Sequence, residues 1–261
     1  MNKIEEHYKQ QAEEHKGSKQ ATMKDITTRE KEIEILLQQL KLIKNKVVNP
    51  RVLEIGCGNG YVSEQLSKQL ELKMECIDFC EDFIEVAKQR NLSQVSFQVG
   101  NVLSLNHPNE TFDSIFTERC LINLETWDNQ KKALENIWKV LKNGGKYIMV
   151  ESFTDGLKNL NDARNVVGLD SIKEPFHNIF FDKEKFINFI KGKFEIENHQ
   201  TFMSSYFFGS RVLYPALARD KLVYNNKFVE FFKHLPSYGN YSHIQLFVLK
   251  KIENGNENTS F

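Results

Sequence analysis

Between residues 51 and 151 the chain alternates short apolar runs with segments whose apolar residues recur every three or four positions. Short apolar runs bounded by turn residues are typical of buried strands, and the wider spacing is typical of amphipathic helices. The pattern predicts strand 51–55, helix 60–70, strand 73–78, helix 81–90, strand 94–99, strand 112–117, helix 127–142 and strand 145–151. Such alternation predicts an α/β fold with a mostly parallel sheet and helices on both faces.

The flanking segments are less regular. Residues 24–47 carry one apolar stripe that includes Ile33, Leu36 and Leu40, which predicts a helix before the first strand. After Glu151 the alternation stops, and residues 152–192 form a polar and aromatic insertion with a helix expected at 182–191. Two late strands are expected at about 193–202 and 243–250. We see no internal repeat and no low-complexity linker, so residues 1–261 are expected to form a single domain.

Charge and composition exclude some classes of partner. Lysine plus arginine equals aspartate plus glutamate, 35 each, so no global positive field would attract nucleic acid. The polar N-terminus does not read as a signal peptide, and the sequence has no run of 18 apolar residues that could span a membrane. We therefore expect a cytoplasmic protein that binds neither nucleic acid nor a membrane. The four cysteines lack metal-ligand spacing and are expected to be reduced packing thiols, with no metal site.

The stretch "RVLEIGCGNG", residues 51–60, places three glycines directly after the first strand. Such a turn can simply end a strand, or its exposed N–H groups can hold a cofactor because no Cβ blocks the approach. The dinucleotide fingerprint would place its third glycine at position 61, which is Tyr61. The spacing therefore argues against a dinucleotide.

With Glu54 before it, Gly56-Cys57-Gly58-Asn59-Gly60 resembles motif I of class I S-adenosylmethionine-dependent methyltransferases. The resemblance covers about residues 50–152 and includes "FDSIFTERCLINL" and "ALENIWKVLKNGGKYIMVES". It implies a Rossmann-like fold with a seven-stranded, mostly parallel sheet whose last strand is antiparallel. It also implies S-adenosylmethionine as cofactor and S-adenosylhomocysteine as product.

The same resemblance implies where the cofactor would bind. Asp78 ends the second strand, where the family has an acidic residue on the ribose hydroxyls, and a carboxylate can accept both hydrogen bonds. Asn101 stands where the family usually has an aspartate for the adenine amino group, and its carbonyl could still accept that bond. Arg29 could pair with the methionyl carboxylate. The predicted cofactor site is Glu54, Gly56, Cys57, Gly58, Gly60, Asp78, Phe79, Asn101, Val102, Glu118, Arg119, Tyr8, Met23 and Arg29.

Catalysis of methyl transfer depends mainly on positioning, and a general base is needed only when the acceptor keeps its proton at neutral pH. His177, in the insertion expected to cover the substrate, is the preferred base, with Glu118 and Tyr206 as further catalytic candidates. For each a simpler reading stays open: a loop histidine, an ion pair at a strand end, and a packed helix. His243, at the start of the last strand, is expected to be structural.

The acceptor is expected to be a small molecule. Asn123, Arg211 and Tyr214 are the predicted substrate residues, and the arginine suggests an anionic acceptor. The C-terminal part looks most like methyltransferases of bacterial cell-surface polysaccharide pathways, which suggests an oxygen of a nucleotide-linked sugar or of a phosphate- or phosphoramidate-type metabolite. An NAD-dependent oxidoreductase and a catalytically silent cofactor-binding protein remain alternatives, and the protein could be a monomer or a homodimer.

These expectations divide the chain into an N-terminal helical lid at 1–48 and a cofactor-binding core at 49–152. Substrate-covering insertions are expected at 153–192 and 203–242, and a frayed tail at 253–261.

Overall fold

A computed structural model describes residues 6, 9–11, 13, 14, 18, 25–218 and 226–253. Two predicted cofactor residues, Tyr8 and Met23, lie outside the described residues, as does the expected tail beyond residue 253. No helix in the described part of the chain combines the length and apolar character needed to cross a membrane.

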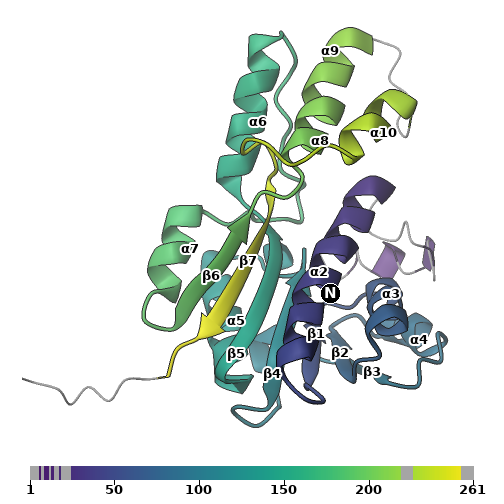
Figure 1. The fold of residues 1–261 in the computed structure, drawn as a ribbon, viewed down its shortest axis with the longest axis vertical. Coiled ribbons are helices and arrows are strands. Elements are labelled where there is room, and N and C mark those ends of the chain that lie inside the picture. Colours follow the sequence, from purple (N-terminus) through teal and green to yellow (C-terminus); the bar gives the residue numbers. More distant parts are fainter. Residues whose placement is uncertain are drawn as a thin grey trace, which may run out of the picture.

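Seven strands form one sheet in the order β3-β2-β1-β4-β5-β7-β6 (Figure 1). Their bounds are β1 Val52–Ile55, β2 Met74–Asp78, β3 Val95–Val99, β4 Phe112–Glu118, β5 Leu141–Ser152, β6 Phe194–Gln200 and β7 Ile244–Lys251. β7 pairs antiparallel with both β5 and β6, and the other pairs are parallel. The predicted fold class is confirmed. The reversed β7 also places its first residues beside the last residues of β5.

The longer helices connect and cover these strands. Their bounds are α2 Ile26–Lys46, α3 Tyr61–Leu70, α4 Glu81–Lys88, α5 Trp127–Val140, α6 Thr154–Val166, α7 Lys183–Ile190, α8 Ser204–Phe208, α9 Tyr214–Ala218 and α10 Lys227–Lys233. Single turns occur at η1 Val102–Ser104 and η2 Leu121–Asn123, and a π-helical turn, η3 Gly209–Leu213, joins α8 to α9. α6, α8, α9 and α10 stand together beyond the carboxyl ends of the parallel strands (Figure 1).

Two details differ from the expected elements. The helix predicted at 127–142 ends at Val140, and β5 begins at once, so Gly144, with φ of +73°, lies in the irregular start of the strand. The α6 helix was not predicted, because Gly156 and several polar residues obscure its pattern. The structure explains this glycine: a Cβ at position 156 would lie 2.0 Å from the carbonyl oxygen of Ser242. Close packing against the start of β7 therefore outweighs the low helix propensity of glycine.

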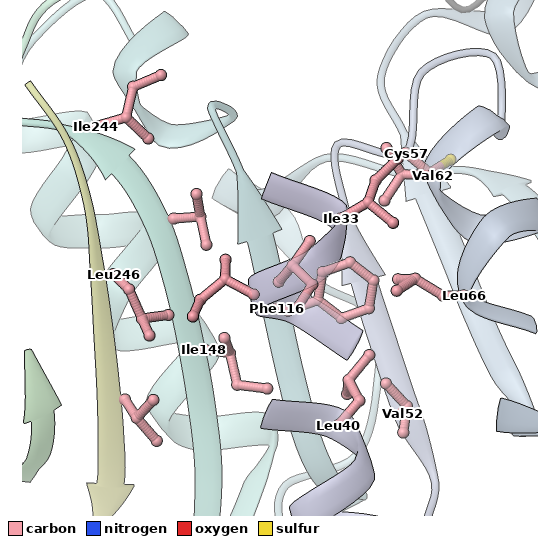
Figure 2. Packing of buried hydrophobic residues seen from close by; sticks show 14 of the residues in the cluster. Ile33, Leu40, Val52, Cys57, Val62, Leu66, Phe116, Ile148, Ile244 and Leu246 are labelled. Atoms are coloured by element: carbon pink, nitrogen blue, oxygen red, sulfur yellow. The ribbon is translucent and has the colours of Figure 1, made fainter. Parts of the chain in front are cut away.

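Apolar side chains pack on both faces of the sheet. On one face Ile33 and Leu40 of α2 and Leu66 of α3 meet Phe116 of β4 and Ile148 of β5 (Figure 2). On the other face the helices α5 and α7 pack against the sheet through Leu134, Ile137 and Phe186. Burial of this kind contributes about 25 cal/mol per Å² of apolar surface. The packing of Ile33 and Leu40 on the sheet fixes α2 in place. The first turn of α2 then reaches the carboxyl edge of the strands.

Candidate functional site

A cavity of about 550 Å³ opens at the carboxyl edge of the sheet. Its wall combines the glycine turn after β1, the ends of β2, β3, β4 and β5, the start of α2, the loop around residues 172–180 and the start of β7. Open parallel sheets bind ligands at this edge. The cavity is therefore the candidate site.

The glycine turn forms one end of the cavity. Gly56, Gly58 and Gly60 have φ values of +82°, +51° and +73°, a region that other residues enter only with strain. A Cβ at Gly56 would lie 2.5 Å from Sγ of Cys120, whereas a Cβ at Gly58 would meet no protein atom within 4 Å. Backbone conformation and close packing thus explain why residue 56 is a glycine, whereas Gly58 borders open space in the cavity.

Asp78 ties the glycine turn to the end of β2. Its two carboxylate oxygens accept the N–H of Gly58 at 2.8 Å and the N–H of Cys80 at 2.9 Å. Burial raises the pKa of Asp78 to about 6, although these backbone donors favour the ionised form. Each oxygen keeps a lone pair for a further hydrogen bond, so the carboxylate could still receive ribose hydroxyls.

Glu54 lies buried beneath the turn. Its Oε2 accepts from the hydroxyl of Ser63 at 2.5 Å and from the thiol of Cys76 at 3.3 Å. Burial, reinforced by the charges of Glu118 and Asp78, raises the pKa of Glu54 to about 7. The carboxyl group is therefore near its titration point at neutral pH.

The wall next to the turn carries the residues predicted for the adenine. Phe79 is 40% exposed, more than an aromatic side chain of the core would be. Oδ1 of Asn101 accepts the N–H of Leu103 at 2.8 Å, which fixes the amide at the start of η1, and Val102 is buried behind it. All three line the cavity, and their contact with adenine stays a prediction.

Four charged side chains meet where α2 crosses the end of β4. Nε of Arg119 donates to Glu32 at 2.9 Å, and its Nη2 donates to Glu118 at 2.9 Å. Arg29, 7% exposed, lies in the same group, and Glu32 is completely buried. Arg119 also has a φ of +49°, and such strain is often found at functional sites.

The pKa values of the two carboxyl groups among these four side chains are shifted in opposite directions. Burial raises the pKa of Glu32 well above its usual value. Burial would also raise the pKa of Glu118, but Arg119 and Arg29 together hold it below its usual value. Of the two carboxyl groups, Glu32 is therefore the one that favours its proton, and the two arginines face the more readily ionised Glu118. Such a group can hold a carboxylate.

Three residues predicted to act on the acceptor lie behind the cavity wall. Nη2 of Arg211 pairs with Asp25 at 2.7 Å, and the hydroxyl of Tyr206 donates to the same carboxylate at 3.0 Å. Tyr214 packs near Phe228, with 5.9 Å between the ring centroids. Asp25 lines the cavity, whereas these three do not. Burial raises the pKa of Tyr206 to about 12, which does not suit a base. Their placement therefore favours roles in holding α2 against α8 and η3 over contact with the acceptor.

We expect Arg211→Met to lower the free energy of unfolding by about 1–3 kcal/mol, the scale of a partly buried hydrogen bond between charged groups. Lys233→Met is the control, because Lys233 also pairs with α2, through Glu30, and that carboxylate is more exposed. An exposed pair contributes about 0–1 kcal/mol. Urea unfolding of both variants measures the difference, and equal losses would contradict a structural role for Arg211.

The far end of the cavity contains the remaining predicted residues and some that the sequence analysis missed. Asn123, whose Nδ2 donates to the carbonyl of Arg119 at 2.8 Å, and His177, edge-on to Phe176, are both in the wall. Ser152 and His243 join them and were not predicted to take part in the site. Their positions at the end of β5 and the start of β7 were the available signal, because antiparallel pairing brings these two strand ends together.

Comparison with known proteins decides the family. Residues 52–145 match the model of a family described as a methyltransferase domain. An uncharacterized methyltransferase of Bacillus subtilis is 29% identical over 133 residues, 49% of each chain. The malonyl-[acyl-carrier protein] O-methyltransferase of Bacillus cereus is 28% identical over 151 residues, 54% of this chain and 55% of that protein. The chain carries a class I S-adenosylmethionine-dependent methyltransferase domain.

A solved structure extends the likeness in fold across almost the whole chain. The N-methyltransferase NodS of Bradyrhizobium japonicum, in complex with S-adenosylhomocysteine, has a TM-score of 0.59 and 16% identity over 97% of this chain and 100% of that one. By contrast, the chain spans about half the length of the curated relatives it matches. The likeness to the curated relatives therefore covers part of the chain, whereas the likeness in fold to the solved structure covers nearly all of it.

The residues of the methyltransferase domain fit S-adenosylmethionine, the cofactor of the family. The turn at Gly58 leaves room for a ligand against the backbone, Asp78 offers acceptors for hydroxyl groups, and the group around Arg119 offers positive charge for a carboxylate. Gly58, Asp78, Arg29 and Arg119 all line one cavity.

We expect Asp78→Ala to weaken binding of S-adenosylhomocysteine by about 1.5–3 kcal/mol, the scale of hydrogen bonds to a charged group. Asp113→Ala is the matched control, because Asp113 also accepts a backbone N–H, that of Arg51 at 2.9 Å, but lies outside the cavity wall. Calorimetric titration measures both affinities. Unchanged affinity in Asp78→Ala would show that the ribose lies elsewhere.

Proposed function

We propose that this chain transfers a methyl group from S-adenosylmethionine to a small-molecule acceptor. The observation that carries the proposal is the single cavity, in which a cofactor end built from Gly58, Asp78 and Arg119 continues into a second end built from Asn123, His177 and His243. When bound, the cofactor supplies an activated methyl group on a sulfonium. The chain's own residues then have to hold and orient both partners.

Positioning is the main contribution that the described residues would make. Glu118 and Arg119 are fixed by their mutual ion pair and by Glu32. Glu151 holds the segment that follows, because its Oε1 accepts the N–H groups of Cys120 at 3.0 Å and Leu121 at 2.9 Å. This segment leads into Asn123. A rigid segment that positions the reacting molecules supports an effective molarity worth about 7–11 kcal/mol.

The finer acceptor prediction belongs to the same proposal. The resemblance of the C-terminal part supports an oxygen of a nucleotide-linked sugar, or of a phosphate- or phosphoramidate-type metabolite, in surface polysaccharide synthesis. Arg211, the predicted anion ligand, pairs with Asp25. Lys173 lines the cavity and could take its place, although Glu125 in the same wall carries the opposite charge.

Two measurements test the proposed function. Calorimetric titration should show tight binding of S-adenosylhomocysteine and none of NAD, and the reverse result would favour an oxidoreductase. An assay with methyl-labelled S-adenosylmethionine and a deproteinised bacterial metabolite extract should then give a labelled product. Binding of the sulfur compound without any product would favour a cofactor-binding protein that does not catalyse methyl transfer.

A further inference from the structure

His243 lies at the carboxyl edge of the sheet, in the acceptor end of the cavity. It directly precedes β7, and its carbonyl accepts the N–H of Phe153 at 2.7 Å. In the antiparallel pairing of β5 with β7, Ser152 is opposite Ile244, and in the parallel pairing of β4 with β5, Glu118 is opposite Val150. His243 is therefore two strands away from Glu118 along one edge, on the side expected for the acceptor.

Three contacts hold the imidazole ring of His243. Nδ1 is 3.1 Å from Oγ of Ser152. One face is stacked on Phe180, with 5.1 Å between centroids and 17° between planes, and Phe207 approaches edge-on with 4.9 Å between centroids. In the described part of the chain Nε2 makes no hydrogen bond, and His243 lines the cavity. Nε2 is therefore the polar ring atom left for a molecule in the cavity.

We propose that the acceptor atom is a hydroxyl oxygen and that Nε2 of His243 takes its proton during methyl transfer. This inference rests on the proposed function. It assigns a catalytic role to a residue that was expected to be structural. It makes Ser152 a positioning residue, because Oγ of Ser152 can accept the proton of Nδ1 in the tautomer that leaves Nε2 unprotonated.

The proposed step balances in atoms and charge. A lone pair of the acceptor oxygen forms the bond to the methyl carbon while the bond from that carbon to sulfur breaks, and the electrons of the broken bond stay on sulfur. The hydroxyl proton passes to Nε2. The positive charge of the sulfonium thus ends on the imidazolium, and no further reactant is required.

The state of the ring favours a hydroxyl over other acceptors. Burial, together with the charges of Arg211 and Arg119, lowers the pKa of His243 to about 3, so the ring is neutral at neutral pH. A methylated oxonium is a far stronger acid than even this imidazolium, and it would give up its proton. A methylated ammonium is a weaker acid and would keep its proton, and a carboxylate has no proton to lose. A weakly basic, neutral imidazole therefore matches an alcohol.

The transfer assay with methyl-labelled S-adenosylmethionine and deproteinised metabolite extract tests this proposal. His243→Gln should lower the rate by about 100-fold, the lower end of a typical general-base contribution, while the affinity for S-adenosylhomocysteine stays unchanged. His199→Gln is the matched control, because the imidazole of His199 is also stacked on a phenylalanine, Phe247, but lies outside the cavity wall. It should keep full activity.

The product and the ring itself give two further readouts. The labelled product should be an alkali-stable methyl ether; an alkali-labile ester or an N-methyl product would overturn the proposal. In the complex with S-adenosylhomocysteine, ¹⁵N NMR should show the His243 ring with its proton on Nδ1 and none on Nε2. A proton on Nε2, or a wild-type rate in His243→Gln, would overturn the assignment while leaving methyl transfer intact. Absence of any product despite cofactor binding would instead remove the proposed function.

Discussion

Replacing Gly58 with valine should weaken binding of S-adenosylhomocysteine by about 100-fold, because forcing methyl groups into a site that a ligand fills costs about 1–3 kcal/mol. Gly58 has a φ of +51° and lines the cavity, and a Cβ there would meet no protein atom within 4 Å. The valine side chain would therefore enter the space that we assign to the cofactor.

Gly168→Val separates this effect from backbone strain. Gly168 follows α6 with a φ of +75°, and a Cβ there would also meet nothing within 4 Å, but the residue is outside the cavity wall. Both variants should lose about 1–2 kcal/mol of folding stability, since each puts a side chain in the left-handed region. Only Gly58→Val should lose affinity in calorimetric titration. Normal affinity in that variant would move the cofactor away from the glycine turn.

The part of the site that depends on strand ends could be predicted from the sequence. The apolar runs that form β1, β2 and β4 end at Glu54-Ile55, Asp78 and Glu118, so local pattern alone placed these side chains at one edge. Parallel topology then brings them together, because the carboxyl ends of parallel strands share an edge. Glu54, Asp78 and Glu118 accordingly line one cavity.

The pairs that join distant segments could not be predicted in this way. Asp25 and Arg211 are 186 residues apart, and Glu32 and Arg119 are 87 apart. Each pair forms only because α2 packs across the sheet and reaches its edge, which no local pattern specifies. The predicted role of Arg211 illustrates the consequence: an arginine in an aromatic segment suggests an anion ligand until a distant carboxylate is found beside it.

The role that we propose for His243 was missed for a related reason. A histidine at the start of a strand would lie at the opposite edge if the strand were parallel to its neighbours. The reversed direction of β7 places it at the carboxyl edge, 91 residues along the chain from Ser152. An antiparallel last strand was expected, so the position followed from the topology, whereas the contacts with Phe180 and Phe207 did not.

The buried acid beneath the glycine turn should make folding stability depend on pH. The pKa of Glu54 is raised from 4.5 to about 7 in the folded protein, mainly by burial. Because the folded state binds this proton more tightly than the unfolded chain, the resulting stability is complete below about pH 4.5 and is lost as the pH rises through about 7. A pKa shift of this size corresponds to a change of about 3 kcal/mol in the free energy of unfolding once the group is fully titrated. Glu151, with a pKa of about 7, and Asp78, with a pKa of about 6, act in the same direction.

Glu54→Gln isolates the contribution of Glu54 to this pH dependence of stability. Glutamine keeps an oxygen that can accept from Ser63, but it cannot ionise. From about pH 5 to about pH 8, urea unfolding should show the variant gaining about 2–3 kcal/mol relative to the wild type. Glu85→Gln, at an exposed position on α4, should give a curve parallel to that of the wild type. A parallel curve for Glu54→Gln would mean that Glu54 does not titrate in this range. The expected divergence would instead show that Glu54, beneath the glycine turn, loses its proton near neutral pH and that this ionisation lowers the free energy of unfolding.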